Sequence, residues 1–528
     1  MTKRVLITDS ISPAAIDVLR RSVDVDVRLG LTPAQLQSTI GEYEALIVRS
    51  ETKVTRQVID SGSKLEIIGR AGVGVDNIDV DAATRRGIFV INSREGNIVS
   101  TAEHTIAMLL AAARQIPKAN SDLHAGVWNR AVKGIEVRNK VLGIVGLGKV
   151  GTTVAEMAKG LRINVIAYDP MVSQTLADKL GVQLVDMGTL LARSDFVSVH
   201  VPLNQTTRGL IGAEQIEMMK PTAMLINCAR GGIIDEQALY KALETGRLAG
   251  AAIDVFTAEP AIGNVLLGSE RAVLTPHLAA STSEAETSAG IDVAEQVVSV
   301  LGGGPPKSPV NAPAVSPEGM TIVGGYLRAA TTLGVIGAQM LAGQAKSITI
   351  RYQGEISGHN TDPIKAAVLG GLLESVTDER VNIVNMDIVA GSRGLGIAEE
   401  RFSTCENYSS MLTVEIEGTS GRVVVAGSSL RDTVYLVRVN DFWFEIEPAG
   451  AYLLFTEHKD RPGMIGAVGT IMGNAGINIS QMQVSRDLKR GGNAMMVMCI
   501  DDPMSLDARQ RIQAIPDIYK VHVVKLNG

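Results

Sequence analysis

Three ionisable side chains follow successive apolar runs in the middle of the chain. Arg230 comes after MLINCA, Glu259 comes shortly after AAIDVF, and His277 comes after RAVLTP. An imidazole can accept a hydroxyl proton near neutral pH, and a carboxylate beside it favours the protonated form and holds one tautomer. A guanidinium can bind a carboxylate through two parallel hydrogen bonds. Together these groups could oxidise an alcohol next to a carboxylate, provided that a hydride acceptor binds nearby.

A glycine-rich turn upstream could bind that acceptor. GLGKVG, at 146–151, follows the apolar run VLGIV and opens a helical pattern. Gly146 permits the tight turn, Gly148 lets a pyrophosphate approach the backbone, and Gly151 lets the helix pack on the strand. The next apolar run ends in Asp169, at the spacing expected for an acid that binds ribose hydroxyls. A glycine turn alone could be structural, but the acid favours a dinucleotide, and its charge would repel a 2′-phosphate, so we expect NAD.

Two series of alternating strand and helix patterns, at about 3–95 and 140–277, must position these groups. Such alternation predicts parallel sheets, in which the carboxyl ends of the strands converge on one crevice. Arg230, Glu259 and His277 should meet there. Without the cofactor motif each would more commonly be a solvated turn residue or a structural histidine. A long helix, predicted over 99–116, connects the two series and is a plausible dimer contact.

The chain changes character after residue 283. A helical segment at 283–303 is followed by GGGPPKSPVNAPAVSPEG (302–319), which is too rich in glycine and proline for a core element and marks a domain boundary. Residues 320 to about 450 mix helix and strand patterns. Within them, 322–343 is weakly polar, but Arg328, Gln339 and five glycines favour a packed helix or helix pair over a membrane span. Residues 451–528 follow a βαββαβ order, which predicts a ferredoxin-like unit.

Composition excludes several classes of function. A chain of 528 residues predicts three or four compact units. With 3% aromatic residues and a net charge of −6, it offers little for nucleic acid or for an anionic membrane. The three cysteines, Cys228, Cys405 and Cys499, have no CxxC spacing, so we expect neither disulfides nor a metal site. The N-terminal MTKRVLITDS lacks the apolar core of a signal peptide. We expect a cytoplasmic protein.

Six motifs carry a resemblance to a known family. GLGKVG, YDP, VPLNQTTRGLIG, INCARGGIIDEQAL, GAAIDVFTAEP and TPHLAAST resemble the D-isomer-specific 2-hydroxyacid dehydrogenases over roughly residues 1–315. The resemblance implies that Arg230, Glu259 and His277 are the catalytic set. Lys149 and Val150 stand where Arg and Ile are common, which are conservative departures. The positions that we expect to contact NAD are Gly146, Gly148, Lys149, Val150, Gly151, Asp169, Cys228, Ala229, Arg230, Asp254, His277, Ala279 and Ala280.

The resemblance also implies an α/β fold with a domain inserted in another. A Rossmann-type NAD domain (100–283) would interrupt a flavodoxin-like substrate-binding domain made of 1–99 and 284–312. An intervening α+β domain (313–450) and a C-terminal ferredoxin-like ACT domain (451–528) would follow.

Loops at the predicted strand ends of the first domain should face the crevice. Arg49 and Ser50 could bind an anion, Gly74 could donate its backbone N–H to a carboxylate, and Asn97 could hold a polar group. With Arg230 they form the predicted substrate site. Ordinary solvated loops are an equally good interpretation of these segments.

The segment 458–486, HKDRPGMIGAVGTIMGNAGINISQMQVSR, is similar to ACT domains, which are small regulatory modules that bind amino acids. The positions that match an L-serine site are His458, Asp460 and Asn478, although some relatives carry Asn in place of Asp460. A purely structural dimerisation domain is the alternative.

The whole chain resembles the long members of the dehydrogenase family. That resemblance implies NAD-dependent oxidation of 3-phospho-D-glycerate to 3-phosphohydroxypyruvate, the first step of phosphorylated serine biosynthesis, under serine feedback. A glyoxylate, hydroxypyruvate or 2-hydroxyglutarate dehydrogenase is the alternative within the family. A non-catalytic NAD sensor is a third hypothesis, because relatives of this fold serve as transcriptional corepressors. We expect a homo-oligomer, either a dimer or a tetramer.

Overall fold

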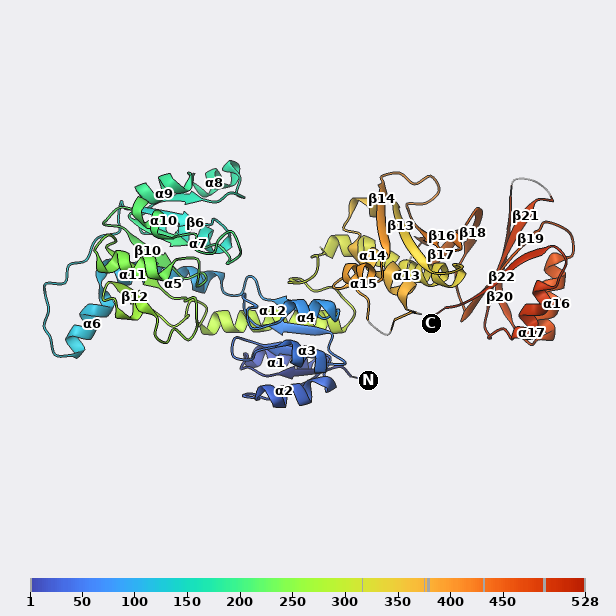
Figure 1. The fold of residues 1–528 in the computed structure, drawn as a ribbon, viewed down its shortest axis with the longest axis horizontal. Coiled ribbons are helices and arrows are strands. Elements are labelled where there is room, and N and C mark those ends of the chain that lie inside the picture. Colours follow the sequence, from blue (N-terminus) through green and yellow to red (C-terminus); the bar gives the residue numbers. More distant parts are fainter. Residues whose placement is uncertain are drawn as a thin grey trace.

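The computed structural model describes residues 2–315, 317–374, 376–377, 380–430, 433–487 and 491–526. Within these residues the chain forms four sheets in an elongated molecule, in which the unit of the first sheet lies between those of the second and third sheets and the unit of the fourth sheet lies at the far end (Figure 1). The first two sheets are parallel and carry the predicted dehydrogenase motifs, whereas the third is mixed and the fourth antiparallel.

The first sheet has the strand order β2-β1-β3-β4-β5, with all neighbours parallel. Its strands are β1 (Arg4–Ile7), β2 (Asp24–Val27), β3 (Ala45–Val48), β4 (Ile67–Arg70) and β5 (Phe89–Asn92). The helices between them are α1 (Pro13–Arg20), α2 (Pro33–Thr39), η1 (Ile40–Glu42), α3 (Arg56–Ser61) and α4 (Val80–Arg85). A helix from much later in the chain, α12 (Ser283–Leu301), packs against α1 and β4 and completes the core of this unit.

The second sheet has seven strands in the order β12-β11-β10-β9-β6-β7-β8. They are β6 (Val141–Val145), β7 (Asn164–Tyr168), β8 (Gln183–Leu184), β9 (Phe196–Val199), β10 (Met224–Asn227), β11 (Gly250–Ile253) and β12 (Ala272–Leu274). The associated helices are α5 (Ile98–Arg114), α6 (Ile116–His124), α7 (Lys149–Gly160), α8 (Gln174–Leu180), α9 (Met187–Arg193), α10 (Ala213–Met218), α11 (Glu236–Glu244) and η2 (Val265–Gly268). The strand order reverses between β6 and β9, which is where open parallel sheets bind ligands.

The third sheet has the order β14-β13-β15-β16-β17-β18 and is antiparallel except for the pair β13 and β14. Its strands are β13 (Ala345–Gly354), β14 (Gly396–Phe402), β15 (Ser410–Gly418), β16 (Gly421–Leu430), β17 (Thr433–Val439) and β18 (Phe442–Ile446). Its helices are α13 (Pro317–Met340), η3 (Glu355–Gly358), α14 (Asp362–Leu373) and α15 (Met386–Ser392).

The fourth sheet, in the order β20-β21-β19-β22, is antiparallel throughout. It consists of β19 (Tyr452–Lys459), β20 (Ile479–Arg486), β21 (Asn493–Ile500) and β22 (Ile518–Lys525), with α16 (Met464–Asn474) and α17 (Leu506–Gln513). This is the predicted βαββαβ order. The four sheets confirm the predicted fold class: two parallel α/β units, an α+β unit and a ferredoxin-like unit.

For residues 322–343 the sequence predicts either one packed helix or a pair of helices. The structure has the single helix α13 there. It packs on α14 and on the third sheet through Val323, Leu333 and Ile336, all buried. The helix begins at Pro317, inside the segment predicted as a linker. In the described part of the chain, no helix combines the length and the apolar character needed to cross a membrane.

Candidate active site

His277 and Glu259 lie side by side after strands β12 and β11. The imidazole Nδ1 is 2.8 Å from Oε2 of Glu259, and about 40% of each side chain is exposed (44% and 40%). The other oxygen of Glu259 accepts a hydrogen bond from the backbone N–H of Phe256 at 3.0 Å, which fixes the carboxylate. The Nε2 atom of His277 is therefore the ring nitrogen left to act on a ligand.

The loop that carries His277 has an unusual backbone. His277 has φ 56°, in the left-handed region that residues with a Cβ seldom adopt. Its N–H donates to the carbonyl oxygen of Asp254 at 2.8 Å. The carboxylate of Asp254 accepts hydrogen bonds from the next two backbone amides, those of Leu278 at 2.8 Å and Ala279 at 3.0 Å. Asp254, which is fully buried, therefore holds the loop in this conformation.

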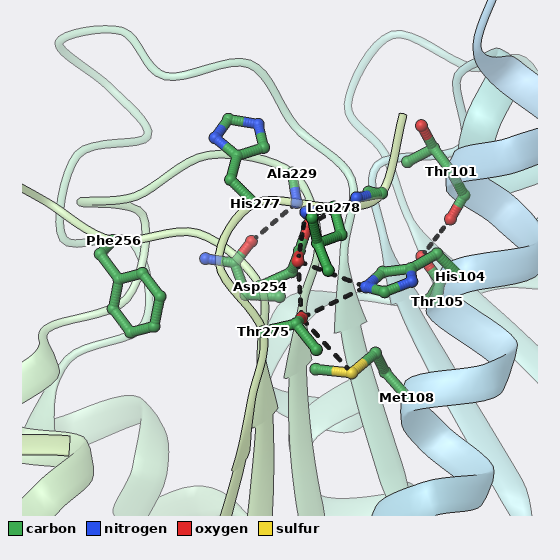
Figure 2. Close-up of polar contacts among 12 residues, drawn as sticks. Thr101, His104, Thr105, Met108, Ala229, Asp254, Phe256, Thr275, His277 and Leu278 are labelled. Carbon is green, nitrogen blue, oxygen red and sulfur yellow. Dashed lines mark hydrogen bonds and ion pairs between the residues drawn. The ribbon is translucent and has the colours of Figure 1, made fainter. Parts of the chain in front are cut away.

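A second histidine supports Asp254 from helix α5. The Nε2 atom of His104 lies 3.3 Å from Oδ1 of Asp254, and the hydroxyl of Thr275 donates to the same oxygen at 2.6 Å. Figure 2 shows His104 reaching this network from α5, while the ring of His277 points away from it. Burial alone would raise the pKa of Asp254, but these donors and the two loop amides lower it below its ordinary value. The buried group is therefore a carboxylate, not a neutral acid.

The glycine turn has the geometry that a dinucleotide requires. Gly146 has φ 98°, and a Cβ on it would lie 2.8 Å from the carbonyl oxygen of His200. A Cβ on Gly151 would lie 2.1 Å from the carbonyl oxygen of Gly146, so the helix can approach the turn only with glycine there. By contrast, a Cβ on Gly148 would meet no heavy atom within 4 Å. The open space at Gly148, at the N-terminus of α7, fits a pyrophosphate.

Asp169 lies directly behind this turn. One oxygen accepts a hydrogen bond from Leu147 N–H and the other from Met171 N–H, both at 2.8 Å. A carboxylate has about four lone-pair sites, so both oxygens can still accept from ribose hydroxyls. The residues present thus fit NAD.

Most of the remaining predicted cofactor residues lie around the carboxyl ends of β10 to β12, whereas Lys149 and Val150 belong to the first turn of α7. Cys228 and Ala279 are buried, whereas Ala229, Val150 and Ala280 are partly exposed. Burial raises the pKa of the Cys228 thiol to about 12, so it stays neutral. Lys149, at the start of α7, forms an ion pair with Glu95 of the first unit, and both side chains are mostly exposed.

Arg230 lies where the two parallel units meet. Its Nε is 3.9 Å from Oδ2 of Asp76, and a Cβ on Gly74 would lie 2.7 Å from one of its terminal nitrogens. Its other terminal nitrogen donates to the carbonyl oxygen of Ala229 at 2.7 Å. Among the described residues Arg230 makes no hydrogen bond or ion pair with His277 or Glu259, so the structure joins two of the three predicted catalytic residues directly and places the third beside Gly74.

Arg70, at the end of β4, is a candidate that the sequence analysis missed. Burial and the nearby Arg230 lower the pKa of Arg70 to about 10, and Arg49 adds to this effect. Its buried Nε has no hydrogen-bond partner among the described residues. The guanidinium fills the space beside Gly72, where a Cβ would lie 1.9 Å from it. The sequence offers only the position of this arginine at the end of the run LEIIGR, and its nearness to Arg230 depends on the packing of the two parallel units.

The other predicted substrate residues are Arg49, Ser50 and Asn97. Arg49 is partly exposed and donates to Glu286 at 2.8 Å. Ser50 is exposed. Asn97 precedes α5, and its side chain makes no capping bond to the helix. These side chains surround the same strand ends but do not form a hydrogen-bonded cluster within the described residues.

In the fourth unit the three predicted serine-binding residues have separate partners. His458 is buried, and burial lowers the pKa of its imidazole despite the nearby Asp460. Asp460 lies 3.6 Å from Arg486, and Asn478 donates to Asp501 at 2.6 Å.

Three family models match the chain. The D-isomer specific 2-hydroxyacid dehydrogenase NAD binding domain matches residues 106–279, the D-3-phosphoglycerate dehydrogenase intervening domain matches 322–440, and the ACT domain matches 452–517.

The similar proteins extend over the whole chain. A D-3-phosphoglycerate dehydrogenase of Synechocystis sp. is 43% identical over 526 residues, which cover 99% of this chain and 95% of the relative. One of Archaeoglobus fulgidus is 41% identical over 99% of this chain and 100% of its own. The crystal structure of the TT0316 protein from Thermus thermophilus matches 58% of this chain and 99% of its own, with 33% identity and a TM-score of 0.54. The chain therefore belongs to the D-3-phosphoglycerate dehydrogenase family, NAD-dependent D-isomer specific 2-hydroxyacid dehydrogenases with an intervening domain and an ACT domain.

Proposed function

We propose that the protein oxidises 3-phospho-D-glycerate to 3-phosphohydroxypyruvate, the first step of phosphorylated L-serine biosynthesis. The observation that carries this proposal is the group of three guanidinium ions in which the charges of Arg230 and Arg49 both act on Arg70, where the two parallel units meet. The described carboxylates nearby are Glu286, which pairs with Arg49, Asp76, which is 85% exposed and 3.9 Å from Arg230, and Asp9, which already accepts hydrogen bonds from three backbone amides. Such a concentration of positive charge is relieved by a ligand that carries both a carboxylate and a phosphate.

Each group has a distinct proposed role. Arg230 binds the substrate carboxylate and polarises the adjacent carbonyl, with the Gly74 N–H as a second donor. Arg70 and Arg49 bind the phosphate, while Ser50 and Asn97 hold polar groups of the substrate. His277 takes the hydroxyl proton on Nε2 during oxidation and returns it in reduction, and Glu259 stabilises the resulting imidazolium. NAD, when bound, accepts the hydride.

The proposed NAD site consists of the glycine turn, Asp169 and the residues at the ends of β10 to β12. Lys149, Val150, Cys228, Ala229, Asp254, Ala279 and Ala280 complete the proposed contacts. Asp254 acts by holding the loop that presents His277.

We also propose the domain boundaries stated above. The return of α12 to the first sheet supports a discontinuous substrate-binding domain, made of 1–99 and 284–312, around an NAD domain at 100–283. The third sheet lies within 313–450 and the fourth within 451–528.

The assignment of the substrate is tested by an NADH-release assay. Purified protein is given NAD with 3-phospho-D-glycerate, D-glycerate, D-2-hydroxyglutarate or glycolate. We expect turnover with the phosphorylated acid to exceed that with D-glycerate, and His277→Ala to abolish it while NAD binding persists. Equal rates with D-glycerate would reject the phosphate site, and unchanged turnover in His277→Ala would reject the proposed acid/base.

Regulation by serine is proposed for the ACT domain, through His458, Asp460 and Asn478. Its test is inhibition of the same assay by L-serine in the wild type and in Asn478→Ala. Inhibition that is equal in the two proteins would place the effector elsewhere.

A cytoplasmic homo-oligomer, as a dimer or tetramer, is the proposed state. The free cysteines Cys228, Cys405 and Cys499 support a reducing compartment. The segment after α5 supports self-association, because Leu123, Val127 and Trp128 have 57%, 51% and 79% of their surface exposed. Light scattering of Trp128→Glu tests the contact, and an unchanged mass would exclude it.

A further inference from the structure

A cavity of about 810 Å³ lies between the first unit and the third-sheet unit, away from the catalytic residues. The first unit contributes the segments before β3 and β4 and the end of α4, and the third-sheet unit contributes residues around α15. In a parallel sheet these strand beginnings form the edge opposite the carboxyl ends, where Arg49 and Arg70 lie. The cavity is therefore separate from the proposed active site.

The described lining of this cavity is strongly cationic. The lining contains two carboxylates, Glu44 and Glu66, and six basic side chains. The basic side chains are Lys3, Lys64, Arg85, Arg86, Arg380 and Arg393. Glu66 pairs with Lys3 and, at 3.1 Å, with Arg380. Glu44 accepts a hydrogen bond from the backbone N–H of Arg4 at 2.7 Å. The two carboxylates are therefore already engaged.

Three of the basic groups are not engaged. Lys64, Arg85 and Arg393 are exposed and make no hydrogen bond or ion pair with any described residue. Arg86 instead donates to the backbone carbonyls of Ile59 and Asp60. Positive charges gathered around one cavity attract an anion into it, and this attraction weakens as the ionic strength rises.

The position of the cavity links two units of the chain. Next to it, Asn382 donates to the carbonyl oxygen of Gly87 at 2.7 Å, and Glu66 pairs with Arg380. Lys64 and Arg85 belong to one side of this junction and Arg393 to the other. A ligand that contacts all three would hold the two units together.

We propose that this cavity binds a small anion with at least two negative charges, of the phosphate-ester or polycarboxylate type, which bridges the first and third-sheet units. The volume is that of a small-molecule site. The described lining includes no aromatic side chain on which a nucleic-acid base could stack, so the chemistry favours a small ion.

The test is calorimetric titration of the full-length protein with inorganic pyrophosphate, and in parallel with citrate, in the presence of NADH. Pyrophosphate binding alone identifies a phosphate ester as the ligand class, and citrate binding alone identifies a polycarboxylate. The triple variant Lys64→Gln/Arg85→Gln/Arg393→Gln should weaken binding about tenfold or more, since three charge contacts are lost. Arg20→Gln, an exposed arginine on α1 of the same unit, is the matched control and should bind like the wild type.

Two further measurements keep the proposal testable. The charge-preserving variant Lys64→Arg/Arg85→Lys/Arg393→Lys should retain binding, and turnover should be the same in all variants, because none of the three residues belongs to the proposed catalytic set. Amide exchange should slow at 62–66, 84–88 and 386–394 when pyrophosphate binds. Slowing confined to 70–77 and 146–151, equal affinity in the triple glutamine variant, or no binding of either probe would overturn the proposal.

Discussion

The pair formed by His277 and Glu259 makes a prediction whose size follows from its geometry. Glu259→Gln preserves the shape of the side chain and an oxygen near His277 Nδ1, but it removes the negative charge. That charge matters most after the hydroxyl proton has moved, when the imidazole is positive. The variant should therefore lose kcat and leave the binding of NAD unchanged.

The magnitude can be bracketed from the 2.8 Å separation of the two atoms. Two unit charges at this distance attract by about 1.5 kcal/mol at the dielectric constant of water and by about 6 kcal/mol at an effective value of about 20. Because 44% and 40% of the two side chains are exposed, the lower end of this range applies. Each tenfold in rate corresponds to about 1.4 kcal/mol, so we expect kcat to fall between about 10-fold and 100-fold.

The assay is NADH formation from 3-phospho-D-glycerate at saturating substrate, with NAD affinity measured separately by fluorescence. Glu214→Gln, an exposed glutamate of α10 with no partner among the described residues, is the control and should keep wild-type kcat. A kcat for Glu259→Gln within twofold of wild type, with the fold intact, would refute the proposed role of the carboxylate.

Other predictions concern the phosphate site, the cysteines and acid stability. Arg70→Gln should raise KM for 3-phospho-D-glycerate about 10-fold to 100-fold and leave KM for NAD unchanged, and equal increases in both constants would contradict a phosphate contact. Burial raises the pKa of Cys228 to about 12 and that of Cys499 to about 11, so a thiol reagent at pH 8 should label native protein only at the partly exposed Cys405 and unfolded protein at all three positions. Burial lowers the pKa of His200 to about 4, whereas an unfolded histidine titrates near pH 6.5, so the unfolded chain binds more protons between these values and stability falls as the pH falls, by up to about 2.5 kcal/mol at pH 4.5. Urea unfolding of the NAD domain at pH 7.5 and 4.5 should show a smaller loss in His200→Gln than in the wild type, and an equal loss would exclude this histidine as the cause.

Much of the fold could be predicted because its signals are local. Alternating apolar runs and helical patterns specify parallel strands, and Gly146 and Gly151 are required by close backbone approaches at the turn itself. The middle of the chain was harder to predict. Its sheet pairs β13 with β14 in parallel inside an otherwise antiparallel order, and that register depends on packing between segments about fifty residues apart.

In the candidate site, too, residues with a local signal could be predicted, and residues that depend on contacts between distant segments could not. Arg230, Glu259 and His277 could be named from their positions after strands. Arg70 could not, because its meaning depends on Arg230, a residue 160 positions later that reaches it only when the two parallel units pack together. The cationic cavity is also invisible in the sequence, since Lys64, Arg85 and Arg393 become neighbours only through the contact of the first and third-sheet units.

The carboxylate of Asp254 makes no bond to the imidazole of His277. Asp254 acts instead on the backbone of the loop that carries this histidine. A left-handed conformation at a residue with a Cβ costs of order 1–3 kcal/mol, so the loop needs compensating bonds. Asp254 supplies them: its carbonyl oxygen accepts from the N–H of His277, and its carboxylate accepts from the following two amides. His104 and Thr275 donate to the same carboxylate, which keeps it ionised although it is buried. Asp254 thus acts on catalysis through the backbone and Glu259 acts through the ring, so the two acids beside this histidine have separate physical tasks.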